Sequence, residues 1–299
     1  MSDQSLLSAV PDGRYLPEFR SVDEILAHAR FNDAVIVFVD GLVGLWSHDP
    51  RLRPMLEYER AVCFMLIVCL AAVEDEARPE TWLTMAHLRE ILPQMSIAPD
   101  RPIMDFVGSL VEDDLIRLEP SPLDRRARRI VPSQRMLELD REWLSVIHAP
   151  LHCLYPNMTY ELALARDEAH HRAYRQASVQ VFAVANYIMT SNPPADYFVR
   201  EAVGSRIFVM LMAEAERDPE QRSDRAFLTR AAARAGASRT HVRNVLKGAA
   251  ERGYLRLPEG GDNRIEAMPI LIESGRRWVA ECLAATDLTH RIALALLKA

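Results

Sequence analysis

The residues best suited to bind a charged ligand lie in one short segment, 225–252. This segment carries seven Lys or Arg residues and one acidic residue, although the whole chain has a net charge of −6. Guanidinium and ammonium groups gathered in one place can bind phosphates, and Arg also pairs with guanine. The composition therefore predicts a local affinity for nucleic acid rather than a chain covered in positive charge.

Two helices and a turn must position these basic residues. The stretch 228–238 is typical of a short helix followed by a tight turn, in which Gly236 supplies a positive φ. Ser238 is placed to cap the next helix, which we expect over 239–252, with Gly253 as its stop signal. This arrangement predicts a helix-turn-helix whose second helix enters the major groove. Units of this kind also serve as packing or protein-interaction modules.

The predicted second helix has an apolar and a polar face. Val242, Val245 and Leu246 recur at the spacing of a buried face, so the intervening polar residues should face outward. Arg and Asn can read base edges, whereas Thr and Lys can hold phosphates. The candidate DNA-contacting residues of this segment are Ser238, Arg239, Thr240, Arg243, Asn244 and Lys247.

The chain also repeats itself. Residues 98–119 align without a gap with residues 237–258, and both carry the same apolar spacing followed by a short strand. Upstream, 60–66 pairs with 206–212. Each half is therefore predicted to contain a long helix, a Pro-containing break, a helix, a short helix, a turn, a second helix, a two-stranded hairpin and a closing helix. We expect a flexible arm over 1–20 and two units over 21–150 and 151–299, which meet where prolines interrupt the helical pattern near 149–157.

The hairpin of the first half carries a basic tip. A strand over 115–118 leads into Asp124, Arg125 and Arg126, with Arg128 shortly after. This pattern resembles the wing of the MarR family of winged helix-turn-helix regulators, over about residues 55–148 and more loosely in the second half. The resemblance implies that Asp124 orients the wing, that Arg126 enters the minor groove and that Arg125 and Arg128 contribute to DNA binding.

The two halves depart from this family pattern in different ways. The first predicted recognition helix, 99–115, is rich in Asp and Glu, with Arg101 as its candidate contact. The second wing, 259–264, offers only Arg264. The first half thus has a basic wing and the second a basic recognition helix. If both touch DNA, the two operator half-sites should differ.

The resemblance also implies how the halves are joined. MarR-like proteins are usually homodimers held together by long terminal helices. Here we expect a mainly α fold with small β-hairpin wings, in which tandem winged helix-turn-helix units stand on a helical, dimer-like core. The apolar stretches 25–46 and 174–189 would pair with the closing helices in this single-chain pseudo-dimer. Further self-association and a small-molecule effector remain open.

A stretch rich in metal-ligating residues lies between the halves. It contains His148, His152, Cys153, Glu168, His170 and His171. The spacing matches no standard metal motif, and the adjacent His170 and His171 must point to different helix faces. We therefore expect packed or solvated residues, with no metal and no cofactor.

The remaining features favour a regulator. No nucleotide-binding or hydrolase motif is present, so no enzyme is predicted. The start of the chain lacks the pattern of a signal peptide, and the longest apolar run, 61–73, is too short to cross a bilayer. We expect a cytoplasmic, nucleoid-associated repressor that binds double-stranded DNA. The alternative is a tandem winged-helix adaptor that binds proteins in a chromosome-associated complex.

Overall fold

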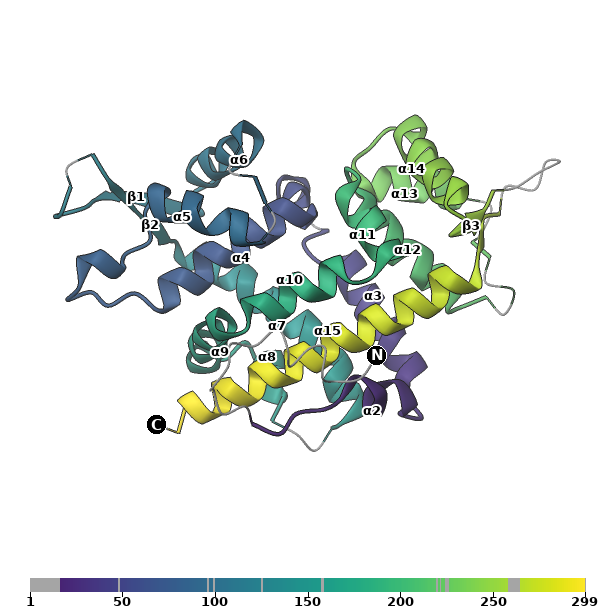
Figure 1. Cartoon of the computed structure of the whole chain (residues 1–299), viewed down its shortest axis with the longest axis horizontal. Coiled ribbons are helices and arrows are strands. Elements are labelled where there is room, and N and C mark those ends of the chain that lie inside the picture. Colours follow the sequence, from purple (N-terminus) through teal and green to yellow (C-terminus); the bar gives the residue numbers. More distant parts are fainter. Residues whose placement is uncertain are drawn as a thin grey trace.

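The fold has two lobes above a layer of long helices (Figure 1). The computed structural model describes residues 17–47, 49–95, 97–98, 100–124, 126–156, 159–218, 220, 222–223, 226–257 and 264–298. Within these residues the chain is 69% helical and has two small antiparallel hairpins, which confirms the predicted mainly α class with small hairpins. The predicted N-terminal arm lies outside the described residues as far as position 16.

The first half builds the left lobe of Figure 1 and part of the layer beneath it. Its elements are α2 (Val22–Ala27), α3 (Phe31–Gly44), the 3-10 helix η1 (Pro50–Leu56), α4 (Tyr58–Ala72), η2 (Pro79–Thr81), α5 (Met85–Ile91), η3 (Leu92–Met95), α6 (Arg101–Glu112), β1 (Ile116–Pro120), β2 (Arg128–Pro132) and α7 (Gln134–Leu154).

The second half builds the right lobe and the rest of the layer. Its elements are α8 (Glu161–Leu164), α9 (Glu168–Gln180), α10 (Phe182–Thr190), α11 (Pro193–Arg200), α12 (Gly204–Ala215), α13 (Phe227–Ala235), α14 (Arg239–Glu251), β3 (Leu255–Arg256), β4 (Glu266–Ala267) and α15 (Pro269–Leu296).

Both lobes repeat one order of elements. A helix (α4 or α12) is followed by two further α-helices, a hairpin and a long closing helix. In each lobe one more residue bridges to the second strand of the hairpin: Thr84 pairs with Arg129, and Arg222 pairs with Glu266. Figure 1 shows α6 and α14 at the same edge of the molecule, with the long helix α15 running beneath. The two lobes therefore present equivalent helices in the same direction.

The layer of long helices joins the two halves through one apolar core. Helix α3 packs along α7, while α15 packs along α9 and α2. Buried residues of α2, α3 and the end of α7 belong to the same hydrophobic cluster as those of the second half. A second cluster fills the first lobe, and Trp143 touches both clusters. Because the two halves share a core, their relative positions are fixed by apolar burial.

The long helices of the layer differ from the predictions in three places. The predicted helix 25–46 is interrupted between α2 and α3, where the His28 ring accepts a hydrogen bond from the Arg30 amide (3.1 Å) in place of a helical bond. The predicted helix 174–189 is interrupted at Val181. Conversely, the break expected at Pro150 is absent, because α7 continues to Leu154 with Pro150 buried. Packing against α3 and α15 outweighs the cost of a helical proline, about 3 kcal/mol.

Candidate nucleic-acid interface

The predicted helix-turn-helix of the second half is present as α13, a turn and α14. Gly236 ends α13 with a φ of 68°, in the left-handed region that favours glycine. The Ser238 hydroxyl then caps α14 by accepting a hydrogen bond from the His241 amide (3.1 Å). Local sequence signals thus set the angle at which α14 leaves the turn.

Helix α14 exposes the face that the sequence predicted. Val242, Val245 and Leu246 are at most 2% exposed, and Ala249 continues this buried row. The predicted outward residues are exposed, namely Ser238, Arg239, Thr240, Arg243, Asn244 and Lys247. The exposed side chains therefore form one polar strip along the first three turns of the helix.

The positive charge of this strip is largely uncompensated. Arg239 and Arg243 form no ion pair with any residue that the structure describes, and Lys247 lies 3.9 Å from Glu251 in an exposed pair. Exposed pairs of this kind are worth little in water. We call the exposed residues Arg239, Arg243 and Lys247 the basic strip.

Other basic residues of the segment make contacts within their own lobe. Arg230 pairs with Glu214 at 2.7 Å, and Arg252 donates to the Gly248 carbonyl while its guanidinium lies 4.4 Å from the centre of the Tyr197 ring. Arg225 lies outside the described residues. The local charge counted from sequence therefore overstates the charge that is free to meet a ligand.

The basic strip stands on a firmly held support. The Tyr197 hydroxyl of α11 donates to the Val245 carbonyl (2.8 Å) beneath α14. At the end of α13, the Arg206 guanidinium lies 3.3 and 3.4 Å from the carbonyls of Arg234 and Ala235. Cations at a helix C-terminus stabilise its unpaired carbonyl groups. Side chains of α11 and α12 thus hold α14 and the end of α13 in place.

The equivalent helix of the first half presents a different surface. Helix α6 begins at Arg101 and ends at Glu112, a shorter span than the predicted 99–115. Asp100, in an extended conformation, caps its start, and Asp114 adopts a positive φ of 56° just after its end. The Arg101 side chain is 90% exposed but lies 3.5 Å from Asp105, one turn along the helix. Glu112 and Asp114 are exposed as well. The outer face of α6 is therefore acidic.

Asp124 shapes the wing of the first half. Its carboxylate accepts a hydrogen bond from the Arg126 amide (2.8 Å), and its carbonyl accepts one from the Ala127 amide (3.0 Å). This is a local turn held by an Asp side chain. The side chains of Arg126 and Arg128 are exposed beside it, whereas Arg125 lies outside the described residues.

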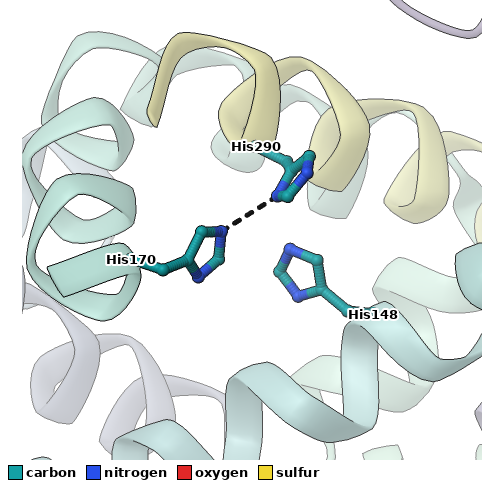
Figure 2. A group of neighbouring side chains, drawn as sticks. All are labelled: His148, His170 and His290. Carbon is teal, nitrogen blue, oxygen red and sulfur yellow. Dashed lines mark hydrogen bonds between the residues drawn. The ribbon is translucent and has the colours of Figure 1, made fainter. Parts of the chain in front are cut away.

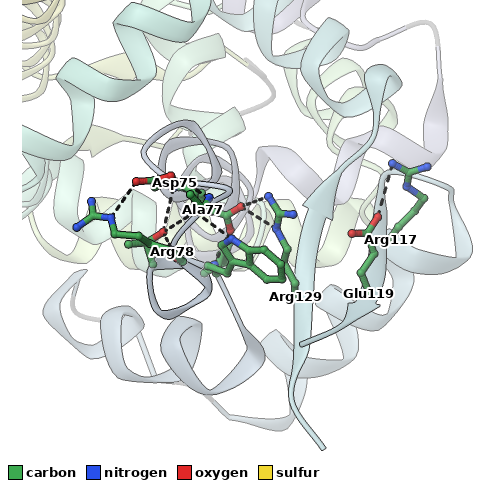
Figure 3. Close-up of polar contacts among 10 residues, drawn as sticks. Asp75, Ala77, Arg78, Arg117, Glu119 and Arg129 are labelled. Atoms are coloured by element: carbon green, nitrogen blue, oxygen red, sulfur yellow. Dashed lines mark hydrogen bonds and ion pairs between the residues drawn. The ribbon is translucent and has the colours of Figure 1, made fainter. Parts of the chain in front are cut away.

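A neighbouring arginine of the wing, Arg129, turns inward instead. Its guanidinium makes two hydrogen bonds to Glu74 (2.6 and 2.9 Å) and lies 4.3 Å from the centre of the Trp82 ring (Figure 3). The Trp82 indole in turn donates to the Asp75 carbonyl (3.1 Å). These contacts fasten the hairpin to the loop after α4, a role that sequence reasoning missed because Glu74 lies 55 residues away.

The wing of the second half is described only at its base. Residues 258–263 lie outside the described residues, and Arg264 is half-buried where the chain returns to β4. On the hairpin itself, Arg256 pairs with Glu266 at 2.8 Å.

A cavity of about 620 Å³ lies between the helical layer and the lobes. Most of its wall is apolar and includes Phe38, Trp143, Phe208 and Trp278. Arg53, Arg206 and Arg234 also line it. Burial lowers the pKa of Arg206 to about 10, and its Nε and Nη2 atoms find no hydrogen-bond partner among the described residues.

Comparison of the chain with models of known families, with curated proteins and with solved structures finds no match in any of the three. Among the described residues, no helix is both long and apolar enough to cross a lipid bilayer. The chemistry of the surfaces described above therefore carries the functional inference by itself.

Proposed function

We propose that the chain is a transcription regulator that binds double-stranded DNA through two winged helix-turn-helix units, one in each lobe. The observation that carries this proposal is the basic strip on α14, exposed and largely unpaired at the same edge of the molecule as α6. Positive side chains at the start of such a helix are suited to reach base edges and phosphates. The resemblance to MarR-like wings supports the same reading, with the helical layer in place of a dimer interface.

In this proposal the two units make different kinds of contact with DNA. The second unit reads bases with α14, because Arg239 and Arg243 are free to pair with guanine. The first unit contributes phosphate and minor-groove contacts from Arg126 and Arg128, because the acidic face of α6 repels phosphates. A single chain of this kind binds an asymmetric operator and, as a repressor in the nucleoid, blocks transcription from it.

A salt titration tests the proposal. Among the described residues, the exposed cations of α14 and of the tip of the first wing are Arg126, Arg128, Arg239, Arg243 and Lys247. If three to five of them neutralise phosphates, the logarithm of the binding constant should fall with the logarithm of salt concentration with a slope of about −3 to −4.5. The measurement uses a random duplex and an operator selected from a random pool. Absence of binding to either at low salt would refute the proposal.

The acidic face of α6 favours one alternative, a tandem winged-helix adaptor that binds proteins. Arg101, the one basic residue at the start of that helix, is paired with Asp105, and the whole chain carries a net charge of −6. An adaptor that binds proteins needs no uncompensated basic surface. The basic strip on α14 is such a surface and therefore favours DNA binding over this alternative. Negligible DNA binding at every salt concentration would favour the adaptor.

The cavity supports a small-molecule effector as part of the proposed regulation. Its apolar wall and the unsatisfied guanidinium of Arg206 suit a ligand with an apolar body and an anionic group. Because Arg206 Nη1 also bonds the carbonyls at the end of α13, a ligand that binds Nε and Nη2 of the same guanidinium can shift that group and so change the position of α13 and α14. By linkage, DNA binding and ligand binding must then change each other's affinity by the same factor.

A further inference from the structure

Three histidines from three different helices meet inside the helical layer. His148 of α7, His170 of α9 and His290 of α15 are all at most 1% exposed. Figure 2 shows their rings turned toward one another. One ring nitrogen of each lies within 4.8 Å of those of the other two. The sequence predicted no metal site in this region, because His290 lies 120 residues beyond His170.

The hydrogen bonds around the cluster leave nitrogen lone pairs directed inward. His148 donates its Nδ1 proton to the Leu144 carbonyl (2.7 Å), so that its Nε2 carries a lone pair, and this atom has no partner among the described residues. When His290 donates from Nε2 to the Thr159 hydroxyl (3.0 Å), its Nδ1 carries a lone pair as well. Bonds of this kind orient the rings of metal-binding histidines.

The cluster is also electrically neutral at ordinary pH. Burial lowers the pKa of His170 and of His290 to about 4, and it lowers the pKa of His148 well below its usual value. Neutral imidazole is the form that binds metal ions. The meeting of three buried ring nitrogens, one of them without a hydrogen-bond partner among the described residues, is the observation that indicates a site for a ligand.

We propose that His148, His170 and His290 bind one divalent transition-metal ion, with Zn²⁺ the best suited. Three imidazole ligands and one open position, filled by water, form a common zinc ligand set. Tetrahedral binding at 2.0–2.1 Å places the ligand nitrogens about 3.3 Å apart. The 2.9 Å contact between His170 Nε2 and His290 Nδ1 has to open slightly, while the third ring moves in.

Metal binding requires one proton shift at His170. In the tautomer in which His290 donates from Nε2, His170 Nε2 donates to His290 Nδ1, so the His170 proton must pass to Nδ1 of the same ring, which has no partner among the described residues. The ring stays neutral, and no proton is lost overall. The bound ion would fasten α7, the closing helix of the first half, to α9 and α15 of the second. Binding of the ion does not depend on the proposed DNA binding.

The test uses the full-length protein after removal of metal by a chelator. Titration with Zn²⁺ in competition with a chromophoric chelator should show one ion per chain and a submicromolar dissociation constant. Co²⁺ in the same protein should give the intense visible absorption of a four-coordinate site. Excess Zn²⁺ should raise the temperature of thermal unfolding, because only the folded chain holds the ion.

Variants assign the ligands. His148→Leu and His290→Leu should each lower the Zn²⁺ affinity about 100-fold or more. His152→Leu is the matched control, because it lies on the same helix one turn away, half-exposed, and should leave the affinity unchanged. Circular dichroism without metal checks that each variant folds.

Three results would overturn the proposal. They are the absence of stoichiometric binding by the wild-type chain, tight binding that survives both substitutions, and equal losses in the His152 control. X-ray absorption at the zinc edge of the wild-type protein needs no variant and keeps the test open if the variants do not fold. Three imidazole nitrogens are expected in that spectrum, and any sulfur ligand contradicts the assignment.

Discussion

The combined substitution of Arg239 and Arg243 by Ala gives the most direct test of the proposed recognition helix. Both side chains lie on the exposed face of α14, and neither pairs with a described residue. Their removal leaves the buried face of the helix and its Ser238 cap intact. Since Ala is a strong helix former, the free energy of unfolding should change by no more than about 0.5 kcal/mol.

The expected loss of DNA affinity is much larger than this change in stability. A good contact between Arg and a base is worth about 1–3 kcal/mol. Two such contacts therefore contribute about 2–6 kcal/mol. Because each 1.4 kcal/mol is a factor of ten, the affinity for the selected operator should fall about 30-fold to 20,000-fold. Affinity for random DNA should fall less, because only the phosphate contribution is lost there.

Fluorescence anisotropy with labelled operator and random duplexes measures both losses. Arg172→Ala is the matched control, because it removes one charge of the same kind from the exposed face of α9 in the helical layer. Arg126→Ala provides the contrasting wing variant, which should weaken binding evenly across sequences and reduce the salt slope by about one. Unchanged operator binding in the double variant, or an equal loss in Arg172→Ala, would refute the assigned recognition helix.

Three further predictions concern stability, each measured by urea unfolding. Asp140→Ala should lower the free energy of unfolding by about 3–5 kcal/mol, since it leaves the buried guanidinium of Arg175 without its counter-charge. A loss below about 1 kcal/mol would contradict this. Burial holds the pKa of His170 and His290 near 4, below the ordinary value. In the presence of a chelator, the free energy of unfolding should therefore be highest above about pH 7 and should decline as the pH falls from 6.5 toward 4. A free energy that stays constant over that range would contradict the presence of buried neutral rings. Gly236→Ala should cost about 1–2 kcal/mol through its positive φ, whereas Gly108→Ala on the open face of α6 should stabilise by up to about 1 kcal/mol; equal effects of the two would contradict this reasoning.

Features of the fold that depend on neighbouring residues could be predicted from the sequence. The turn at Gly236, the cap at Ser238 and the two faces of α14 all follow from residues within a few positions of one another. The internal repeat likewise predicted the common order of elements in the lobes. The interruptions at His28 and Val181, and the continuous helix through Pro150, depend on distant packing, which no local pattern encodes.

The same distinction separates the predicted from the unpredicted site residues. Exposure of Arg239 and Arg243 follows from helical periodicity alone. The inward turn of Arg129 depends on Glu74, and the histidine cluster depends on His290, both far along the chain. The sequence therefore does not show whether a given arginine or histidine faces solvent or a buried partner. Only the tertiary contacts distinguish the two cases.

Helices α6 and α14 show what the proposed combination of two DNA-binding units in one chain would allow. Their buried faces correspond position by position, with Ile103, Phe106 and Val107 of α6 matching Val242, Val245 and Leu246 of α14. Their outer faces do not correspond, since Asp105 and Gly108 of α6 stand where α14 has Asn244 and Lys247. In a homodimer every substitution appears twice, so an acidic helix would remove both reading surfaces at once. Within one chain the apolar faces are constrained by the need to pack, whereas the outer faces are free to diverge, and one unit can keep a basic helix while the other keeps only a basic wing.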